Sequence, residues 1–111
     1  MQLAFANTIE AIVLGSNRAD ATMAGLGRGA GNCPMELLLG FLRNPKFTLR
    51  PVLALLQNHM PDIRKTVEWG PLVPYNITGQ LNLHPRAAIQ CRASENRDDF
   101  VAFYDGIVNE A

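Results

Sequence analysis

The sequence predicts an α/β fold that is mostly α by residue count, with one helix, one strand and then helices only. Three observations lead to this prediction. An apolar segment without Gly or Pro ends at Gly15. A short segment of alternating polarity follows it, as in a strand. The last segment repeats apolar residues at helical spacing. A helix joined by a tight turn to a strand is a unit of parallel sheets.

The composition is that of an ordinary globular chain. It has 111 residues, 48% hydrophobic and 18% charged, which is enough for one small domain. Ten basic and ten acidic residues give a formal net charge of zero. Because no basic cluster alternates with aromatic residues, we expect neither nucleic acid nor an anionic membrane as a partner.

The sequence also indicates a cytoplasmic protein. Its apolar runs near the glycines are far shorter than the roughly 20 residues that a membrane helix needs. The first basic residue is Arg18, so a secretory signal peptide is not expected. Cys33 and Cys91 have neither metal-binding nor redox spacing. We expect two free thiols in a reducing compartment, with a disulfide as the alternative.

The first helix is predicted over residues 2–14, and its few polar positions imply that much of its surface is covered. The strand is predicted over residues 18–23. Its period of two places Asp20 and Thr22 on a polar face, and two alanines on the other face. A lone strand leaves both edges unpaired, so the sequence reads like one end of something larger.

Four glycines then occupy every second position, and an asparagine, Asn32, follows them. Pro34 suits the first turn of a helix that Asn44 and Pro45 end. One alternative is a dinucleotide fingerprint from Gly25 to Ala30, but the helix begins too late to meet a pyrophosphate. A flexible connection is the other alternative.

The remaining elements are predicted to be helices. One begins near Pro51, and prolines and Gly70 interrupt the middle of the chain. Short helices are predicted over residues 75–83 and 85–92, and a last helix follows a cap at Ser94 or Asn96. In the helix that begins near Pro51, the residues expected to face inward are Val52, Leu53, Leu55 and Leu56. Those of the last helix are Phe100, Val101, Phe103, Tyr104, Ile107 and Val108.

The segment NRADATMAGLGRGAGNCPMELLLGFL, residues 17–42, resembles the eighth-strand region of the metal-dependent pyruvate aldolase and acyl-CoA lyase superfamily. It is most similar to 4-hydroxy-2-oxovalerate aldolase-like proteins, and MQLAFANTIEAIVLG resembles the helix before that strand. The resemblance implies a C-terminal fragment of a (β/α)8 TIM barrel: residues 1–43 are the last αβα segment and residues 44–111 a helical extension. A whole barrel takes about 250 residues.

The resemblance also implies a chemistry. Such aldolases and lyases make or cleave a C–C bond beside a pyruvate-like or acyl-CoA-type carbonyl, with Mg2+ or Mn2+ as a Lewis acid. The metal is held by an aspartate, a His-x-His pair and, in some members, the asparagine that matches Asn32. Because the other ligands are absent from this sequence, we expect the chain alone to bind no metal and to be inactive. His59 and His84 are read as an exposed helix-end residue and a turn residue.

Five residues are candidates for the site. Asn32 is a metal ligand or a plain N-cap of the helix after it. Arg28 binds a substrate carboxylate or is a solvated loop residue. Asp20 and Thr22 line the barrel interior near the substrate or form a structural hydrogen-bonded pair. Tyr75 is a catalytic acid or a packed amphipathic side chain.

Two functions from different classes therefore remain open. The first is part of a metal-dependent aldolase or lyase that takes a small oxoacid substrate. The second is a non-enzymatic helical module that self-associates through exposed barrel surfaces or binds an anion at the helix N-terminus near Cys33.

Overall fold

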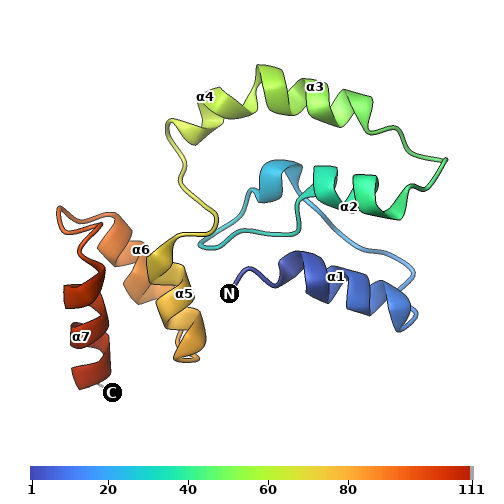
Figure 1. Ribbon diagram of the computed structural model, residues 1–111. Coiled ribbons are helices and arrows are strands. Elements are labelled where there is room, and N and C mark those ends of the chain that lie inside the picture. The colour runs from blue at the N-terminus through green and yellow to red at the C-terminus, as the bar shows by residue number, and fades with distance from the viewer. Residues whose placement is uncertain (111) are drawn as a thin grey trace. The chain divides into compact units, whose positions relative to one another are not determined.

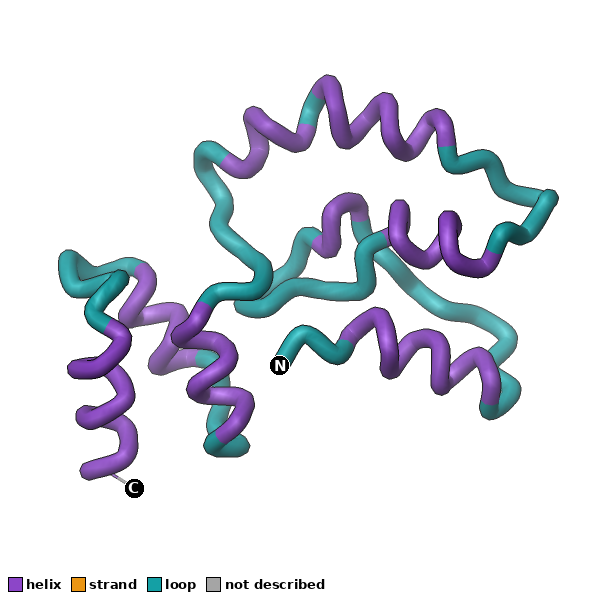
Figure 2. Tube along the Cα trace, in the orientation of Figure 1, coloured by secondary structure: helices purple, strands orange, loops and turns teal. Residues whose placement is uncertain are grey.

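A computed structural model describes residues 1–110, which form two compact units (Figure 1). One unit is Gln2–Gly70, and the other comprises residues 71–110 with Met1. The described residues are mostly helical and include no strand (Figure 2). The first unit holds α1 (Ala4–Val13), a short 3-10 turn η1 (Met23–Gly25), α2 (Met35–Leu42), α3 (Arg50–Asn58) and α4 (Met60–Arg64). The second holds α5 (Val73–Gln80), α6 (Arg86–Arg92) and α7 (Phe100–Glu110).

Helix α1 confirms the first predicted helix. It ends at Val13, and Gly15 follows with a φ of +103°, a conformation that favours glycine. Phe5 meets Phe41 of α2 edge-on, with ring centroids 5.4 Å apart. The rest of the α1 surface is less covered than predicted. Helix α1 has no buried residue, and Leu14 just after it is 78% exposed.

The predicted strand over residues 18–23 is wrong. In its place the chain makes a single parallel bridge between Thr22 and Pro34. The Thr22 amide donates to the Cys33 carbonyl at 3.0 Å, and the Met35 amide donates to the Thr22 carbonyl at 2.8 Å. A ladder cannot extend because Pro34 has no N–H and the chain turns into η1 directly after Thr22. The segment before Thr22 is irregular and mostly exposed.

Helix α2 ends where predicted, but Pro34 is its N-cap rather than a residue of its first turn. Pro34 lies just before it in an extended conformation. Arg43 ends it in the left-handed region, before Asn44 and Pro45. Glu36 in the first turn accepts a hydrogen bond from the Ala24 amide at 3.0 Å. The start of α2 is thereby tied to η1.

Helices α3 and α4 correct one expectation and agree with another. Val52 of α3 is buried as predicted, but its neighbour Leu53 is 48% exposed, because only one face of the helix packs inward. Pro61 marks a break as expected, since α3 ends at Asn58 and Pro61 lies in the first turn of the next helix, α4. A first-turn residue needs no intrahelical N–H donor, so proline is accepted there. Met60 beside it is buried.

The second unit is built around α5, which packs against α6 and α7 (Figure 1). Pro74, Tyr75 and Thr78 are the buried residues of α5. The Thr78 hydroxyl lies within hydrogen-bonding distance of the Pro74 carbonyl at 3.3 Å and the Tyr75 carbonyl at 3.2 Å, so its burial leaves no unpaired polar atom. Ala88 of α6 is fully buried. The predicted short helices thus exist, with slightly different ends.

The cap of α7 is Asp99, not Ser94 or Asn96. Asp99 Oδ1 accepts from the Ala102 amide at 3.1 Å, the pattern of an N-cap side chain. Ser94 instead ends α6, because its hydroxyl donates to the Cys91 carbonyl at 2.7 Å. The two residues predicted from the sequence lie three and five positions before Asp99, and the turn that follows them sets the start of the helix.

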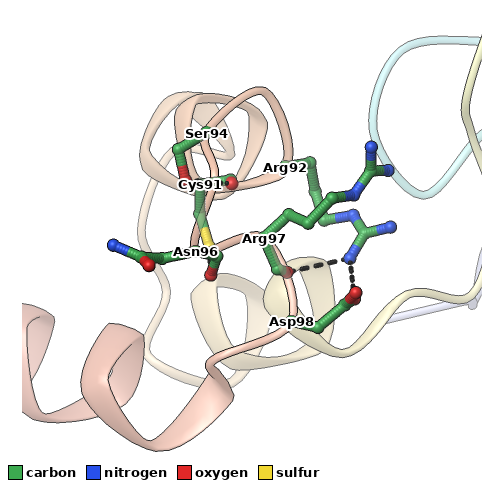
Figure 3. A network of polar contacts seen from close by, with 6 residues as sticks. All are labelled: Cys91, Arg92, Ser94, Asn96, Arg97 and Asp98. Carbon is green, nitrogen blue, oxygen red and sulfur yellow. Dashed lines mark hydrogen bonds and ion pairs between the residues drawn. The ribbon is translucent and has the colours of Figure 1, made fainter.

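A polar network holds the turn between α6 and α7 (Figure 3). Arg92 Nη1 donates to the Arg97 carbonyl at 2.9 Å and to Asp98 Oδ1 at 2.7 Å. The Arg92 side chain is 11% exposed and that of Asp98 is 75% exposed. One guanidinium therefore ties the end of α6 to the residues that precede α7.

No helix in the described part of the chain is long and apolar enough to cross a membrane. Both cysteines are free thiols, as predicted, with Cys33 buried and Cys91 partly buried.

Candidate functional site

The candidate site is the glycine loop, which we define as residues 22–34. The bridge between Thr22 and Pro34 closes its base. Farther out, the Asn32 amide donates to the Gly25 carbonyl at 2.8 Å, and the Gly31 amide donates to the Arg28 carbonyl at 3.3 Å. The loop is thus a folded excursion with its own backbone hydrogen bonds, not an open connection.

Asn32 is fixed by its side chain as well as its backbone. Its Nδ2 donates to the Leu26 carbonyl at 3.0 Å across the loop. Its Oδ1 makes no hydrogen bond to any described residue, and the residue is exposed. Asn32 is not the N-cap of α2, because Pro34 holds that position. Its amide therefore braces the loop with one end and leaves a carbonyl oxygen free for a ligand with the other.

The alternate glycines are explained by close approach. A Cβ on Gly27 would lie 2.8 Å from Asn32 Cγ and still closer to Nδ2. A Cβ on Gly31, where φ is +89°, would lie 2.5 Å from the Gly25 carbonyl oxygen. A Cβ on Gly25 would lie 2.9 Å from the Asn32 carbonyl oxygen. Side chains at these positions would push the two arms of the loop apart.

Trp69 packs against the loop, a role that sequence reasoning missed. It is 3% exposed, and its Nε1 donates to the Ala24 carbonyl at 3.0 Å. The guanidinium of Arg64 lies 4.1 Å from the centre of its ring. The sequence did contain a sign of this role. Trp69 is the one tryptophan of the sequence, and a buried indole needs an acceptor for its N–H.

Asp20 and Thr22 do not form the hydrogen-bonded pair that was the alternative to a substrate role. Asp20 is exposed, and no hydrogen bond joins it to Thr22. Thr22 Oγ1 is buried and has no hydrogen-bond partner among the described residues. The loss of the strand removes the alternation that would have aligned the two side chains.

Arg28 lies in the outer part of the glycine loop and is exposed. Its guanidinium makes no ion pair or hydrogen bond with the described residues. A planar cation of this kind pairs well with a carboxylate. Arg28 and Asn32 are thus the two exposed polar side chains of the loop.

Tyr75 belongs to the other unit, where it is buried in α5. Burial of this degree is what the packed alternative expects of an amphipathic side chain. Its role as a catalytic acid stays a prediction.

The glycine loop could supply one ligand to a divalent metal, Asn32, but not a complete coordination shell. An amide oxygen such as Asn32 Oδ1 is a donor that Mg2+ and Mn2+ accept. Among residues 1–110, no three His, Cys, Asp or Glu side chains come together. His59 is exposed between α3 and α4, and His84 Nδ1 accepts from the Arg86 amide at 3.1 Å. The described residues therefore do not assemble a complete metal site.

A separate open groove of about 440 Å³ lies along α6 and α7. Phe103 and Ile107 give it an apolar wall, and Asp99 and Glu110 are its acidic residues. Asp99 is already engaged as the cap of α7. The remaining lining residues are Ala87, Gln90, Cys91, Ser94, Asn96, Ala102 and Gly106.

Comparison with known proteins finds short, clear similarity to aldolases. The chain is 56% identical over 39 residues to 4-hydroxy-2-oxovalerate aldolase 2 of Dechloromonas aromatica (strain RCB), which covers 35% of this chain and 11% of that protein. It is 52% identical over 42 residues to the 4-hydroxy-2-oxovalerate aldolase of Acidovorax sp. (strain JS42), covering 38% and 12%. The match to that of Polaromonas naphthalenivorans (strain CJ2) is 56% over 39 residues, covering 35% and 11%.

The chain thus spans about a tenth of the length of these relatives. The identity of the matched residues supports an aldolase-like relationship over that short stretch. No family model matches the chain. No solved structure matches it either, so the barrel origin of the segment stays a prediction.

Proposed function

We propose that residues 1–43 contribute the glycine-loop wall of a divalent-metal-dependent aldolase or lyase site. The bond made or cleaved would lie beside the carbonyl of a pyruvate-like or acyl-CoA-type substrate. The aldolase-like relationship of a short stretch supports this proposal. The observation that carries it is the Asn32 amide, which is braced at Nδ2 and open at Oδ1.

The loop residues take distinct roles in this proposal. The Asn32 oxygen offers a neutral ligand to a hard cation, and the hydrogen bond from Nδ2 to the Leu26 carbonyl holds the amide in place. Arg28 offers a positive charge to the carboxylate of an oxoacid. When bound, Mg2+ or Mn2+ would polarise the substrate carbonyl, which is the chemistry that such a site needs from its metal.

We predict that the isolated chain lacks aldolase activity, because no three His, Cys, Asp or Glu side chains of its described residues come together to hold a metal beside Asn32. The assay incubates the chain with Mn2+ and a 4-hydroxy-2-oxoacid and measures released pyruvate. Pyruvate production at an enzymatic rate by the chain alone would contradict the prediction.

A graft tests the proposed function itself. Residues 1–70 of this chain, which include Trp69 as well as the glycine loop, would replace the matching segment and the residues that follow it in 4-hydroxy-2-oxovalerate aldolase 2 of Dechloromonas aromatica, the relative that is 56% identical over 39 residues. If the loop can form that wall, the hybrid keeps measurable aldolase activity. A hybrid that folds but has no activity above background would contradict the proposal.

A second candidate function is a non-enzymatic, self-associating helical module. The specific observation in its favour is a row of exposed apolar side chains on α7, at Val101, Tyr104 and Val108. Their spacing places them on one face of the helix. The anion-binding version is less favoured, because Glu36 already places a carboxylate in the first turn of α2.

A further inference from the structure

We propose that Trp69 is a positioning residue that holds the glycine loop in the shape that presents the Asn32 oxygen. The inference deepens the proposed function, and it rests on that function only for the identity of the ligand. The shape of the loop itself is a property of the chain that does not depend on any ligand.

Trp69 and its neighbour reach both arms of the loop. On the first arm, the indole Nε1 donates to the Ala24 carbonyl at 3.0 Å. On the second arm, the indole edge lies against Gly31, where a Cβ would come 3.2 Å from Cδ1. The Gly70 amide adds a hydrogen bond to the Gly29 carbonyl at 3.0 Å. The segment therefore contacts the loop at three separate points.

These three points surround the hydrogen bond that sets Asn32. Ala24 precedes Gly25, whose carbonyl accepts the Asn32 amide at 2.8 Å. Gly31 precedes Asn32 directly. Holding Ala24 and Gly31 against one rigid ring thus fixes the separation of the arms across which the Asn32 side chain reaches Leu26. Without the ring, three glycines with positive φ leave the loop many other conformations.

A second side chain covers the ring. Arg64, at the end of α4, lies over the ring at 4.1 Å from its centroid. Arg64 is exposed, so this contact contributes less than the buried ones. It supplies a matched control, because changing Arg64 alters the cover of Trp69 but none of the contacts between Trp69 and the loop.

The test is amide hydrogen exchange by NMR on the full chain without ligand, for the wild type and three variants. Trp69→Leu removes both the ring and the donor, Trp69→Phe keeps a ring against Gly31, and Arg64→Gln is the control. In Trp69→Leu we expect the Asn32 amide to exchange about tenfold faster or more, while α1 amides keep their rates. Trp69→Phe should restore part of the protection, and Arg64→Gln should stay near wild type.

The Asn32 side-chain amide gives a second readout. Its Nδ2 protons should move toward the shifts of a free amide in Trp69→Leu, because the bond to the Leu26 carbonyl is lost. If Trp69→Leu unfolds the whole unit, the Trp69→Phe variant is used to test the proposal instead. A loss of amide protection in Trp69→Phe that is confined to the glycine loop supports the proposal. Unchanged exchange and unchanged side-chain shifts at Asn32 in a folded Trp69 variant overturn it. An inactive graft would count against the aldolase proposal and leave this result standing.

Discussion

At the residue scale, the glycine loop explains why small residues and one amide occur together. The Asn32 amide occupies space that a side chain on Gly27 would need, and its Nδ2 closes the loop onto Leu26. The glycines are thus required by packing as much as by backbone conformation.

Gly27→Ala is predicted to destabilise the unit of residues 2–70. The new Cβ collides with the Asn32 amide and breaks its bond to Leu26, which we expect to cost about 1–3 kcal/mol. Urea unfolding followed by the fluorescence of the single tryptophan measures the change. Gly40→Ala is the control, because its Cβ has 3.9 Å to the nearest atom; it should gain about 0.5–1 kcal/mol from helix propensity. Equal effects would refute the packing argument.

Thr22→Val is predicted to leave stability unchanged or to raise it by up to about 1 kcal/mol, since it removes a buried hydroxyl that lacks a partner. Thr78→Val is the matched opposite, because its buried hydroxyl is paired with helix carbonyls; it should lose about 1 kcal/mol. Thermal unfolding of both variants checks the pair. A clear loss in Thr22→Val would mean that its hydroxyl has a partner in solution.

At the element scale, the helices were predictable and the strand was not. Gly15, Pro34 and the Asn44-Pro45 pair mark the ends of α1 and α2 because glycine and proline act locally on the backbone. A strand depends on a partner elsewhere, and residues 18–23 have the pattern without an extended partner in the described chain. The tryptophan contact was equally hidden, since Trp69 and Ala24 are 45 positions apart.

Asp99→Ala is predicted to destabilise the start of α7 by about 0.5–2 kcal/mol, because it removes the acceptor of the Ala102 amide. Asn96→Ala should have a much smaller effect, since its side-chain amide makes no hydrogen bond with the described residues. Amide exchange in the first turn of α7 separates the two. A larger effect from Asn96→Ala would restore Asn96 as the cap.

At the scale of the whole molecule, much apolar surface is uncovered. Val101 is 73% exposed, and Leu14 is more exposed still. Scattered apolar residues on a surface are normal, but rows on one helix face commonly mark contact sites. The sequence predicted uncovered surface on the helix of residues 2–14 and at an unpaired strand; among the described residues it lies on helices and on the segments between them.

We predict that the chain self-associates at rising concentration through the α7 row. Changing Val101→Lys and Val108→Lys together places charges in that row and should shift the sedimentation coefficient toward that of the monomer. Asn109→Lys, also exposed on α7, controls for added charge alone. A wild-type chain that stays monomeric at every concentration tested would contradict this prediction.

The candidate site was predictable in its composition but not in its geometry. The glycine spacing and Asn32 singled out the loop, because few structures need so many small residues beside one amide. Its closure depends on contacts among Asn32, Leu26 and Trp69, which no local pattern reveals.

The most direct measurement is the aldolase activity of the graft with and without Asn32. If the Asn32 oxygen is a working part of the site, Asn32→Ala in the hybrid lowers kcat/KM by at least about tenfold. Asn7→Ala, an exposed amide on α1 with no side-chain hydrogen bond, leaves it unchanged. A hybrid whose activity is the same with Asn32 and with alanine in its place would contradict the account.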